Sequence, residues 1–218
     1  AADDFRIIWD NAYIIHDLTD ETEKLDNIFD ALKKYGHEDM VIEFTSTSKI
    51  SFPGSGVSAV AASETNIKEI ASRLTFQTIG HDKMNQLRHV RYFKNLDGIK
   101  AHMMKHADIM RPKFEMLDEL MTAEIASRGI GTWVKPVGGY FICFESLEGC
   151  AKDIVAKCKE AGVTMTGAGA PFPYKKDPKD NTIRIAPTFP TPEELAVAAD
   201  LFVLCVKLVS VNKLLADK

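Results

Sequence analysis

The stretch from residue 43 to residue 56 constrains the fold of this chain more than any other. A β-branched and aromatic run at 41–45 predicts a buried strand. The strand leads directly into three hydroxyl residues at 46–48, then into Lys49, and then into a turn at Pro53-Gly54. Hydroxyls and unpaired backbone N–H groups at a strand end can hold a phosphate, and a lysine amine withdrawn from water attacks aldehydes. The stretch therefore predicts a lysine that bonds an aldehyde beside a phosphate site.

Two other interpretations of this stretch stay open. A solvated lysine in a surface loop is the simpler one, and the stretch by itself favours neither reading. Ser46 and Lys49 also fit the Ser-x-x-Lys nucleophile motif of penicillin-binding enzymes. That motif works together with Ser-Asp-Asn and Lys-Thr-Gly, and the sequence contains neither tripeptide, so a penicillin-binding enzyme is disfavoured.

A second strand-like run lies upstream, at 5–10, and ends in Asp10 with Tyr13 three residues later. Pyridoxal phosphate chemistry needs a carboxylate at the pyridine nitrogen, so that the ring stays protonated and accepts electrons. It also uses a donor to the ring's phenolic oxygen, which a tyrosine hydroxyl supplies. For Asp10 alone, a helix-capping role is the alternative. Together with the lysine stretch, Asp10 and Tyr13 predict a pyridoxal phosphate site.

Four motifs follow one another along the chain. They are Ile8–Tyr13, Ser46–Lys49 followed by Pro53-Gly54, Gly138-Gly139-Tyr140-Phe141, and Ile183–Pro187. In this order they resemble fold-type I pyridoxal-phosphate aminotransferases, most closely the aspartate aminotransferase-like branch that is related to MocR-type proteins. The resemblance covers essentially the whole chain and is specific for the family, though not for the substrate.

The resemblance implies roles for residues in the first two motifs. Asp10 would pair with the pyridine nitrogen, and Tyr13 with the ring oxygen. Ser46 and Ser48 would hold the phosphate. Lys49 would be the catalytic residue that bonds the cofactor covalently and moves the proton during the reaction.

Arg184 would bind the α-carboxylate of the substrate by the same resemblance. In a strand its side chain points away from those of Ile183 and Ile185. If both isoleucines face the core, Arg184 faces outward, and a surface salt bridge is the simpler interpretation of this motif alone. A planar guanidinium nevertheless suits bidentate binding of a carboxylate, and the set of four motifs favours that role.

Two departures from the family pattern matter. Many relatives carry a phosphate-binding arginine seven or eight residues after the lysine, where this chain has Gly56 and Val57. The phosphate would then be held by Ser55, Ser58 or the backbone of the Gly-Ser-Gly turn. The family also has a long N-terminal portion with a glycine-rich phosphate loop and a ring-stacking residue, which this sequence lacks. We therefore expect a C-terminal part of a longer enzyme, inactive and weak in cofactor binding by itself.

The fold class expected from the resemblance is α/β. It comprises the remainder of the three-layer αβα cofactor domain and a small α+β C-terminal domain. The expected divisions are the C-terminal part of the large domain at 1–97, a long connecting helix at 98–128 and the small domain at 129–218.

The function that the resemblance implies is transfer of an amino group between an amino acid, with aspartate as one candidate, and a 2-oxo acid. A homodimer is expected. The alternatives are a non-catalytic, MocR-type module that senses a ligand, and another pyridoxal phosphate enzyme such as a lyase or decarboxylase. The sequence does not identify the amino donor, because a second arginine for a side-chain carboxylate is not recognisable.

Composition sets outer bounds on these possibilities. The hydrophobic content of 45% and charged content of 27% are ordinary for a globular protein. The net charge of −4 disfavours a nucleic-acid surface, and no apolar run reaches the length of a membrane span. The cysteines lack paired metal spacing, so a reduced, cytoplasmic protein is expected. His102 and His106 have zinc-ligand spacing but no glutamate of the metalloprotease motif, so a metal is disfavoured.

Periodicity and capping signals predict the remaining elements. Helices are expected from Asp20, with Glu23 completing a capping box, to Gly36, from Ser63 to about Leu74, and from Asp82 along Met84, Leu87 and Val90. A long helix is expected along 103–121, kinked or restarted at Pro112, with others at 151–162 and after Thr191. Strands are expected at 57–62, 132–135, 140–144, 163–166 and 182–186.

Overall fold

The computed structural model describes residues 2, 4–20 and 24–217. The chain divides into two compact units, Ala1–Lys105 and His106–Lys218, here called unit 1 and unit 2. The boundary falls within helix α4 (Leu96–Glu124). None of the helices in the described residues is both long and apolar enough to cross a lipid bilayer.

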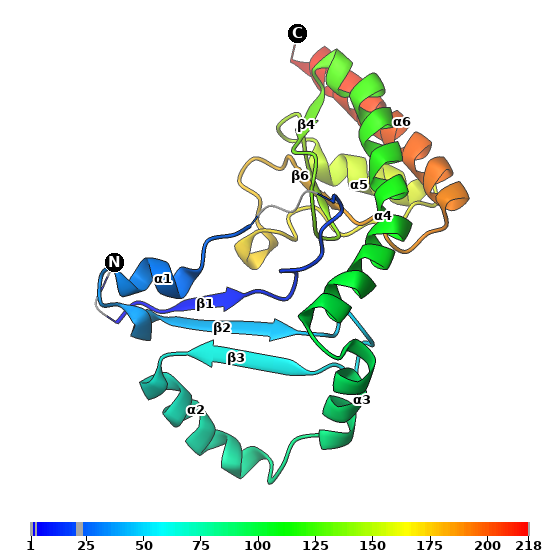
Figure 1. Cartoon of the computed structure of the whole chain (residues 1–218). Coiled ribbons are helices and arrows are strands. Elements are labelled where there is room, and N and C mark those ends of the chain that lie inside the picture. The colour runs from blue at the N-terminus through cyan, green and yellow to red at the C-terminus, as the bar shows by residue number, and fades with distance from the viewer. Residues whose placement is uncertain (1, 3, 21–23, 218) are drawn as a thin grey trace. The chain divides into compact units, whose positions relative to one another are not determined.

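Unit 1 is built on a three-stranded sheet in the order β1-β2-β3 (Figure 1). Strand β1 (Ile7–Asp10) pairs in parallel with β2 (Val41–Ser46), and β3 (Ser58–Ala62) runs antiparallel to β2. Asp10, the last residue of β1, is the register partner of Phe44, and β2 continues to Ser46 at the same edge of the sheet. The parallel pair confirms the strand-helix-strand pattern expected from the sequence, since parallel neighbours need a crossover connection.

Local capping residues set the helices of unit 1. Helix α2 (Glu64–Gln77) begins after Ser63, whose hydroxyl accepts the N–H of Asn66. Helix α3 (Lys83–Phe93) begins after Asp82, whose carboxylate accepts the N–H of Asn85 at 2.9 Å. Both predicted caps are confirmed, because each depends only on a side-chain oxygen two to three residues from the N–H that it binds.

The first helix is shorter than the sequence suggests. Helix α1 (Ile28–Lys33) begins after Asn27, whose side chain accepts the N–H of Phe29 at 2.9 Å. The predicted start at Asp20 is wrong, since residues 24–27 are not helical, and Glu23 lies outside the described residues. A 3-10 turn, η1 (Glu38–Met40), then leads into β2.

Unit 2 has an antiparallel sheet in the order β4-β5-β6. The strands are β4 (Gly131–Trp133), β5 (Ile142–Ser146) and β6 (Thr182–Ile185). Helices α5 (Ala151–Glu160) and α6 (Pro192–Ala216) accompany it, with 3-10 turns η2 (Ala126–Arg128) and η3 (Pro173–Lys175) in the connections. Thr191 forms the predicted capping box with Glu194 at the start of α6. The rings of Phe144 and Phe202 meet edge to face at 5.3 Å in the core.

One expectation for unit 2 is wrong, and one of two alternatives for α4 is excluded. Residues 163–166 form no strand, because the N–H of Val163 closes the end of α5 on the carbonyl of Cys158 at 2.8 Å. Of the two alternatives expected at Pro112, a kink or a restart, the restart is excluded, because α4 continues through the proline. Buried Ala107 and Phe114 lie on either side of the proline, so packing of the flanking turns outweighs the one backbone hydrogen bond that proline removes.

Candidate functional site

The carboxyl ends of β1 and β2 bring the first two sequence motifs together. The N–H of Asn11 donates to the carbonyl of Phe44 at 2.8 Å, and the hydroxyl of Thr45 donates to the carbonyl of Asn11 at 3.4 Å. Asp10 and the hydroxyl run that begins at Ser46 therefore leave the sheet at one edge. The carboxyl ends of parallel strands are where open α/β sheets commonly bind ligands.

The loop after β1 is tied to the lysine residue itself. Asp10 is exposed, and its carboxylate accepts the N–H of Ala12 at 3.2 Å. The ring of Tyr13 meets the buried ring of His16 edge to face at 5.0 Å. His16 Nε2 lies 3.3 Å from the carbonyl oxygen of Lys49, and it donates there because a carbonyl only accepts. Asp10 and Tyr13 thus belong to a loop that is hydrogen-bonded to Lys49.

Lys49 lies in a compact turn that opens a longer loop, residues 47–57, called the lysine loop below. The N–H groups of Ile50 and Ser51 donate to the carbonyl of Thr47 at 2.9 and 2.8 Å. The N–H of Thr47 donates to the carbonyl of Val57 at 2.8 Å, and the N–H of Val57 donates to the hydroxyl of Thr47 at 2.8 Å. Both ends of the loop are therefore closed at Thr47, while the side chain of Lys49 is exposed.

The two serines predicted to hold a phosphate are partners of each other. The hydroxyl of Ser46 accepts the N–H of Ser48 at 3.0 Å and donates to the Ser48 hydroxyl at 2.9 Å. Gly56 lies against them, since a Cβ built on Gly56 would be 3.0 Å from the backbone nitrogen of Ser48. Gly56 of the Gly-Ser-Gly turn is therefore close to the backbone of Ser48, and a phosphate site there stays a prediction.

Sequence reasoning missed the residues that support the lysine loop from α3. The sequence suggested a helix along Met84, Leu87 and Val90, yet these side chains are exposed. The buried face of α3 carries Asn85, His89 and Phe93 instead. The signal was their spacing of four residues, which places them on one side of a helix.

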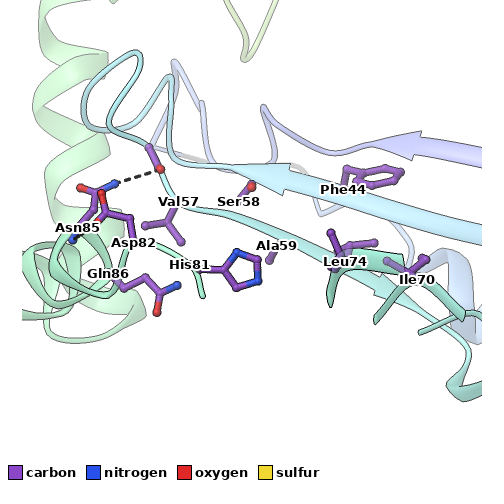
Figure 2. A pocket seen from close by; sticks show the side chains of 12 residues that line it. Phe44, Val57, Ser58, Ala59, Ile70, Leu74, His81, Asp82, Asn85 and Gln86 are labelled. Carbon is purple, nitrogen blue, oxygen red and sulfur yellow. Dashed lines mark hydrogen bonds between the residues drawn. The ribbon is translucent and has the colours of Figure 1, made fainter. Parts of the chain in front are cut away.

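Figure 2 shows a pocket beside this support. It has a volume of about 470 Å³ and lies between β3, α2 and the start of α3. Asn85 borders it and donates to the carbonyl of Gly56 at 3.1 Å, the bond dashed in Figure 2. Phe44, Ile70 and Leu74 form the opposite wall. The pocket therefore lies against Gly56 and Val57, the last two residues of the lysine loop. None of the six predicted site residues borders it.

Arg184 lies in unit 2, inside strand β6. Ile183 and Ile185 are buried, so Arg184 points to the other face of the sheet, as expected. Its guanidinium carbon lies 4.6 Å from the ring centroid of Phe141, a cation–π contact that joins the third and fourth motifs. Within the described part of the chain Arg184 makes no ion pair, and its Nε is buried without a hydrogen-bond partner. The simpler interpretation, a surface salt bridge, is therefore not observed there.

Polar contacts fix both ends of the segment that carries Arg184. Before the strand, the carboxylate of Asp177 accepts the N–H groups of Asn181 and Thr182 at 2.9 and 2.8 Å. Burial alone would raise the pKa of Asp177, but these bonds hold it below its ordinary value. After the strand, the buried ammonium of Lys113 donates to the carbonyls of Thr188 and Pro190 at 2.9 and 2.6 Å. Sequence reasoning predicted a long helix here and missed Lys113.

Comparison with known proteins agrees with this geometry. The family model described as aspartate amino-transferase matches residues 1–218, the whole chain. The chain belongs to the aspartate aminotransferase family. A Mycolicibacterium smegmatis relative of this family is 42% identical over 218 residues, which are 100% of this chain and 51% of the relative. The aspartate aminotransferase of Corynebacterium glutamicum is 41% identical over 208 residues, 95% of this chain and 48% of that enzyme.

Solved structures of aminotransferases confirm the predicted fold class. The aspartate transaminase of Corynebacterium glutamicum matches 96% of this chain with a TM-score of 0.93 and 40% identity, and 50% of that structure is covered. The α-aminoadipate aminotransferase of Thermus thermophilus, solved with N-(5'-phosphopyridoxyl)-L-leucine, matches 94% of this chain with a TM-score of 0.75 and 19% identity. The chain spans about half the length of the curated relatives it matches. The α/β fold is that of the matching half of a fold-type I aminotransferase.

His102, one of the two histidines with zinc-ligand spacing, has contacts of another kind. His102 Nε2 lies 2.9 Å from the carbonyl oxygen of Ile50, and its ring meets that of Phe93 edge to face at 5.3 Å. Among the described residues no three side chains of the metal-binding types come together. His102 instead adds a further contact to the lysine loop.

Proposed function

We propose that the protein is a pyridoxal-phosphate-dependent aminotransferase that moves an amino group between an amino acid and a 2-oxo acid. The observation that carries the proposal is the edge of the unit 1 sheet, where Asp10, the serine pair and Lys49 follow two adjacent parallel strands. The names of the relatives support the reaction class, and aspartate is the donor that they suggest.

The residues at this edge fit the chemistry of pyridoxal phosphate. Asp10 offers a carboxylate for the pyridine nitrogen, Tyr13 a hydroxyl for the ring oxygen, and Ser46 and Ser48 offer hydroxyls for the phosphate. Lys49 offers an exposed primary amine for the aldehyde. The phosphopyridoxyl compound bound to the Thermus relative supports the same cofactor. When bound, the cofactor supplies the electron sink that stabilises negative charge at the substrate's Cα.

Each residue of the chain has a distinct task in this proposal. Asp10 keeps the proton on the pyridine nitrogen, so that the sink remains effective. The amine of Lys49 moves one proton between the substrate's Cα and the cofactor's C4′. Arg184 binds the α-carboxylate that amino acid and 2-oxo acid share, with the two parallel donors of its guanidinium.

The experiment that tests the proposal is covalent trapping on Lys49. The full-length native protein is mixed with pyridoxal phosphate, reduced with borohydride, digested and mapped by mass spectrometry. We expect the cofactor mass on Lys49, loss of that mass and of transamination in Lys49→Ala, and no change in Lys68→Ala, an exposed lysine of α2. Cofactor on another lysine, or an unchanged signal in Lys49→Ala, would contradict the proposal.

Turnover assays separate the proposed reaction from its alternatives. Amino-group transfer from aspartate to a 2-oxo acid is expected. Release of carbon dioxide or ammonia without transfer indicates a decarboxylase or lyase, and cofactor binding without turnover indicates a ligand-sensing module.

We further propose that the enzyme is a cytoplasmic homodimer. Three of the four cysteines, Cys150, Cys158 and Cys205, are buried and free, and burial raises the pKa of Cys158 to about 12, so its thiol stays protonated. Free buried thiols suit a reducing compartment. Light scattering after gel filtration tests the dimer, and a monomeric mass would refute it.

A further inference from the structure

Helix α3 makes four polar contacts with the lysine loop, beside an apolar cluster in which its Phe93 packs with Ile50 of the loop. His89 Nε2 lies 3.1 Å from the hydroxyl of Thr47 and 2.7 Å from the hydroxyl of Ser51. One turn earlier, Asn85 Nδ2 donates to the carbonyls of Ser55 and Gly56 at 2.5 and 3.1 Å. Thr47 lies two residues before Lys49, and Ser51 lies two residues after it. His89 therefore binds the turn that carries Lys49 on both sides of the lysine.

The tautomer of His89 follows from its neighbours. Nδ1 lies 2.8 Å from the carbonyl oxygen of Asn85, which can only accept, so Nδ1 carries a proton. In the neutral ring Nε2 then accepts through one lone pair, which the hydroxyls of Ser51 at 2.7 Å and Thr47 at 3.1 Å share. The Thr47 hydroxyl also accepts the N–H of Val57. One imidazole thus connects α3, the lysine turn and the closing end of the loop.

The residues of this hydrogen-bond network are buried, so its geometry is held rigidly. His89 is 9% exposed and Asn85 is 7% exposed, although the neighbouring Arg88 and Val90 are exposed. Inside a protein, removing one member of such a network leaves its partners without hydrogen bonds, which costs more than the bond itself. An apolar side chain at position 89 would fill the space without fixing the hydroxyls that flank Lys49.

We propose that His89 is a positioning residue that sets where the Lys49 amine stands for its attack on the cofactor aldehyde. The attack replaces the C=O bond of the aldehyde with a C=N bond to the lysine nitrogen, and the aldehyde oxygen leaves as water with the two protons of the neutral amine. The inference rests on the proposed function for its chemical consequence, while the rigid loop that it requires is measurable without any cofactor. In this proposed role His89 contacts neither the amine of Lys49 nor the substrate.

The first test is hydrogen exchange on the cofactor-free, full-length protein. In His89→Leu we expect the amides of Ile50, Ser51 and Val57 to exchange about ten- to a hundredfold faster, as loss of buried hydrogen bonds predicts. His89→Gln keeps an acceptor near the position of Nε2 and is expected to recover most of the protection. Ile154→Ala, a core truncation in unit 2, is the matched control for general destabilisation and should leave these amides unchanged.

The second readout is the rate at which pyridoxal phosphate becomes attached to Lys49, trapped with borohydride at timed intervals. We expect a roughly tenfold slower rate in His89→Leu and near-normal rates in His89→Gln and Ile154→Ala. If His89→Leu does not fold, Ser51→Ala removes one partner hydroxyl and keeps the histidine, and it should loosen the amides of Ile50 and Ser51.

The outcomes separate the two proposals. A wild-type protein in which Lys49 takes no cofactor sinks the proposed function. A wild-type protein that is labelled, with unchanged exchange or unchanged labelling rates in His89→Leu and Ser51→Ala, overturns the role of His89 alone. Equal defects in His89→Leu and Ile154→Ala would also overturn it, because the effect would then be one of general stability.

Discussion

The lysine loop of unit 1 depends mainly on hydrogen bonds, whereas the sheet of unit 2 depends mainly on apolar packing. In unit 2, β5 alternates buried and exposed residues, and its inner side packs on α5 and α6 through apolar side chains such as Phe144, Ile154 and Phe202. In unit 1, β1 and β2 leave Ile8 65% and Phe44 41% exposed. The lysine loop is fixed by hydrogen bonds to α3 and by one small apolar cluster of Ile50, Phe93 and Met103.

The comparison distinguishes interactions that stabilise the fold from interactions that fix the position of a particular atom. Hydrophobic burial is roughly proportional to area and has no direction, so it stabilises unit 2 without placing any one atom. Hydrogen bonds contribute less free energy each, but they have preferred distances and angles. A loop that must present one amine to one carbon is better fixed by the second kind. The following predictions test that division, from the largest expected effect to the smallest.

Asp10→Asn tests whether the edge of the unit 1 sheet carries the chemistry. A neutral amide cannot keep the pyridine nitrogen protonated, so turnover should fall by several orders of magnitude while cofactor binding is largely kept. Steady-state kinetics and an absorbance titration of the cofactor measure the two effects. Asp30→Asn, an acid in α1, is the control, and near-normal turnover by Asp10→Asn would remove Asp10 from the mechanism.

Ile154→Ala tests whether apolar packing in unit 2 carries stability. Ile154 is fully buried, and removal of its side chain should lower the free energy of unfolding by about 2–5 kcal/mol. Urea unfolding measures it. Ile109→Ala removes the same atoms from a residue that is 63% exposed and should cost less than about 0.5 kcal/mol. Equal losses at the two positions would argue against a packed core in this unit.

Arg184→Lys tests the one predicted site residue that unit 2 contributes. Lysine keeps the charge and loses the parallel donors, so kcat/KM should fall about ten- to a hundredfold, equivalent to roughly 1.5–3 kcal/mol. KM should rise for both amino donor and 2-oxo acid, kcat should fall because the Cα–H bond is misplaced, and covalent labelling of Lys49 should stay unchanged. Arg128→Lys is the control. An effect on only one substrate would mean that Arg184 binds a side chain instead.

Asp118→Asn tests a polar contact within the apolar unit. Asp118 accepts the indole N–H of Trp133 at 2.9 Å and pairs with Lys135 at 3.0 Å. Burial alone would raise the pKa of Asp118, but these partners lower it. A lowered folded-state pKa gives stability that is present at neutral pH and lost as pH falls through that value.

We therefore expect Asp118→Asn to be less stable than wild type by about 1 kcal/mol or less near neutral pH, since the pair is partly solvent-screened. The difference should shrink below about pH 4, where the wild-type carboxylate becomes protonated. Urea midpoints across pH measure this, with Glu119→Gln as an exposed control. A difference that grows in acid would contradict the assignment.

Sequence reasoning succeeded where structure depends on near neighbours. The caps at Ser63, Asp82 and Thr191 were predicted because each acts on an N–H two or three residues away. Strand β2 and its lysine turn followed from β-branched residues and a Pro-Gly turn. The family fold followed from four motifs in order, and the comparisons confirmed it. The roles of the six site residues stay predictions.

Sequence reasoning failed where the orientation of a side chain depends on which distant segment packs against it. An apolar period cannot show that α3 turns Asn85 and His89 inward, because their partners lie about thirty to forty residues away in the lysine loop. Nor can it show that Lys113 reaches the carbonyls of Thr188 and Pro190 across unit 2. Buried polar side chains of this kind are recognised only once both partners are in place.

The close approach of Gly56 to Ser48 has a consequence for protein engineering. Grafting the arginine of many relatives onto position 56 would seem a simple way to strengthen phosphate binding. A Cβ there would lie 3.0 Å from the nitrogen and 3.2 Å from the Cα of Ser48, so the turn carrying Lys49 would have to shift by a few tenths of an ångström. An arginine at position 56 would therefore strengthen phosphate binding but move the amine of Lys49 out of alignment.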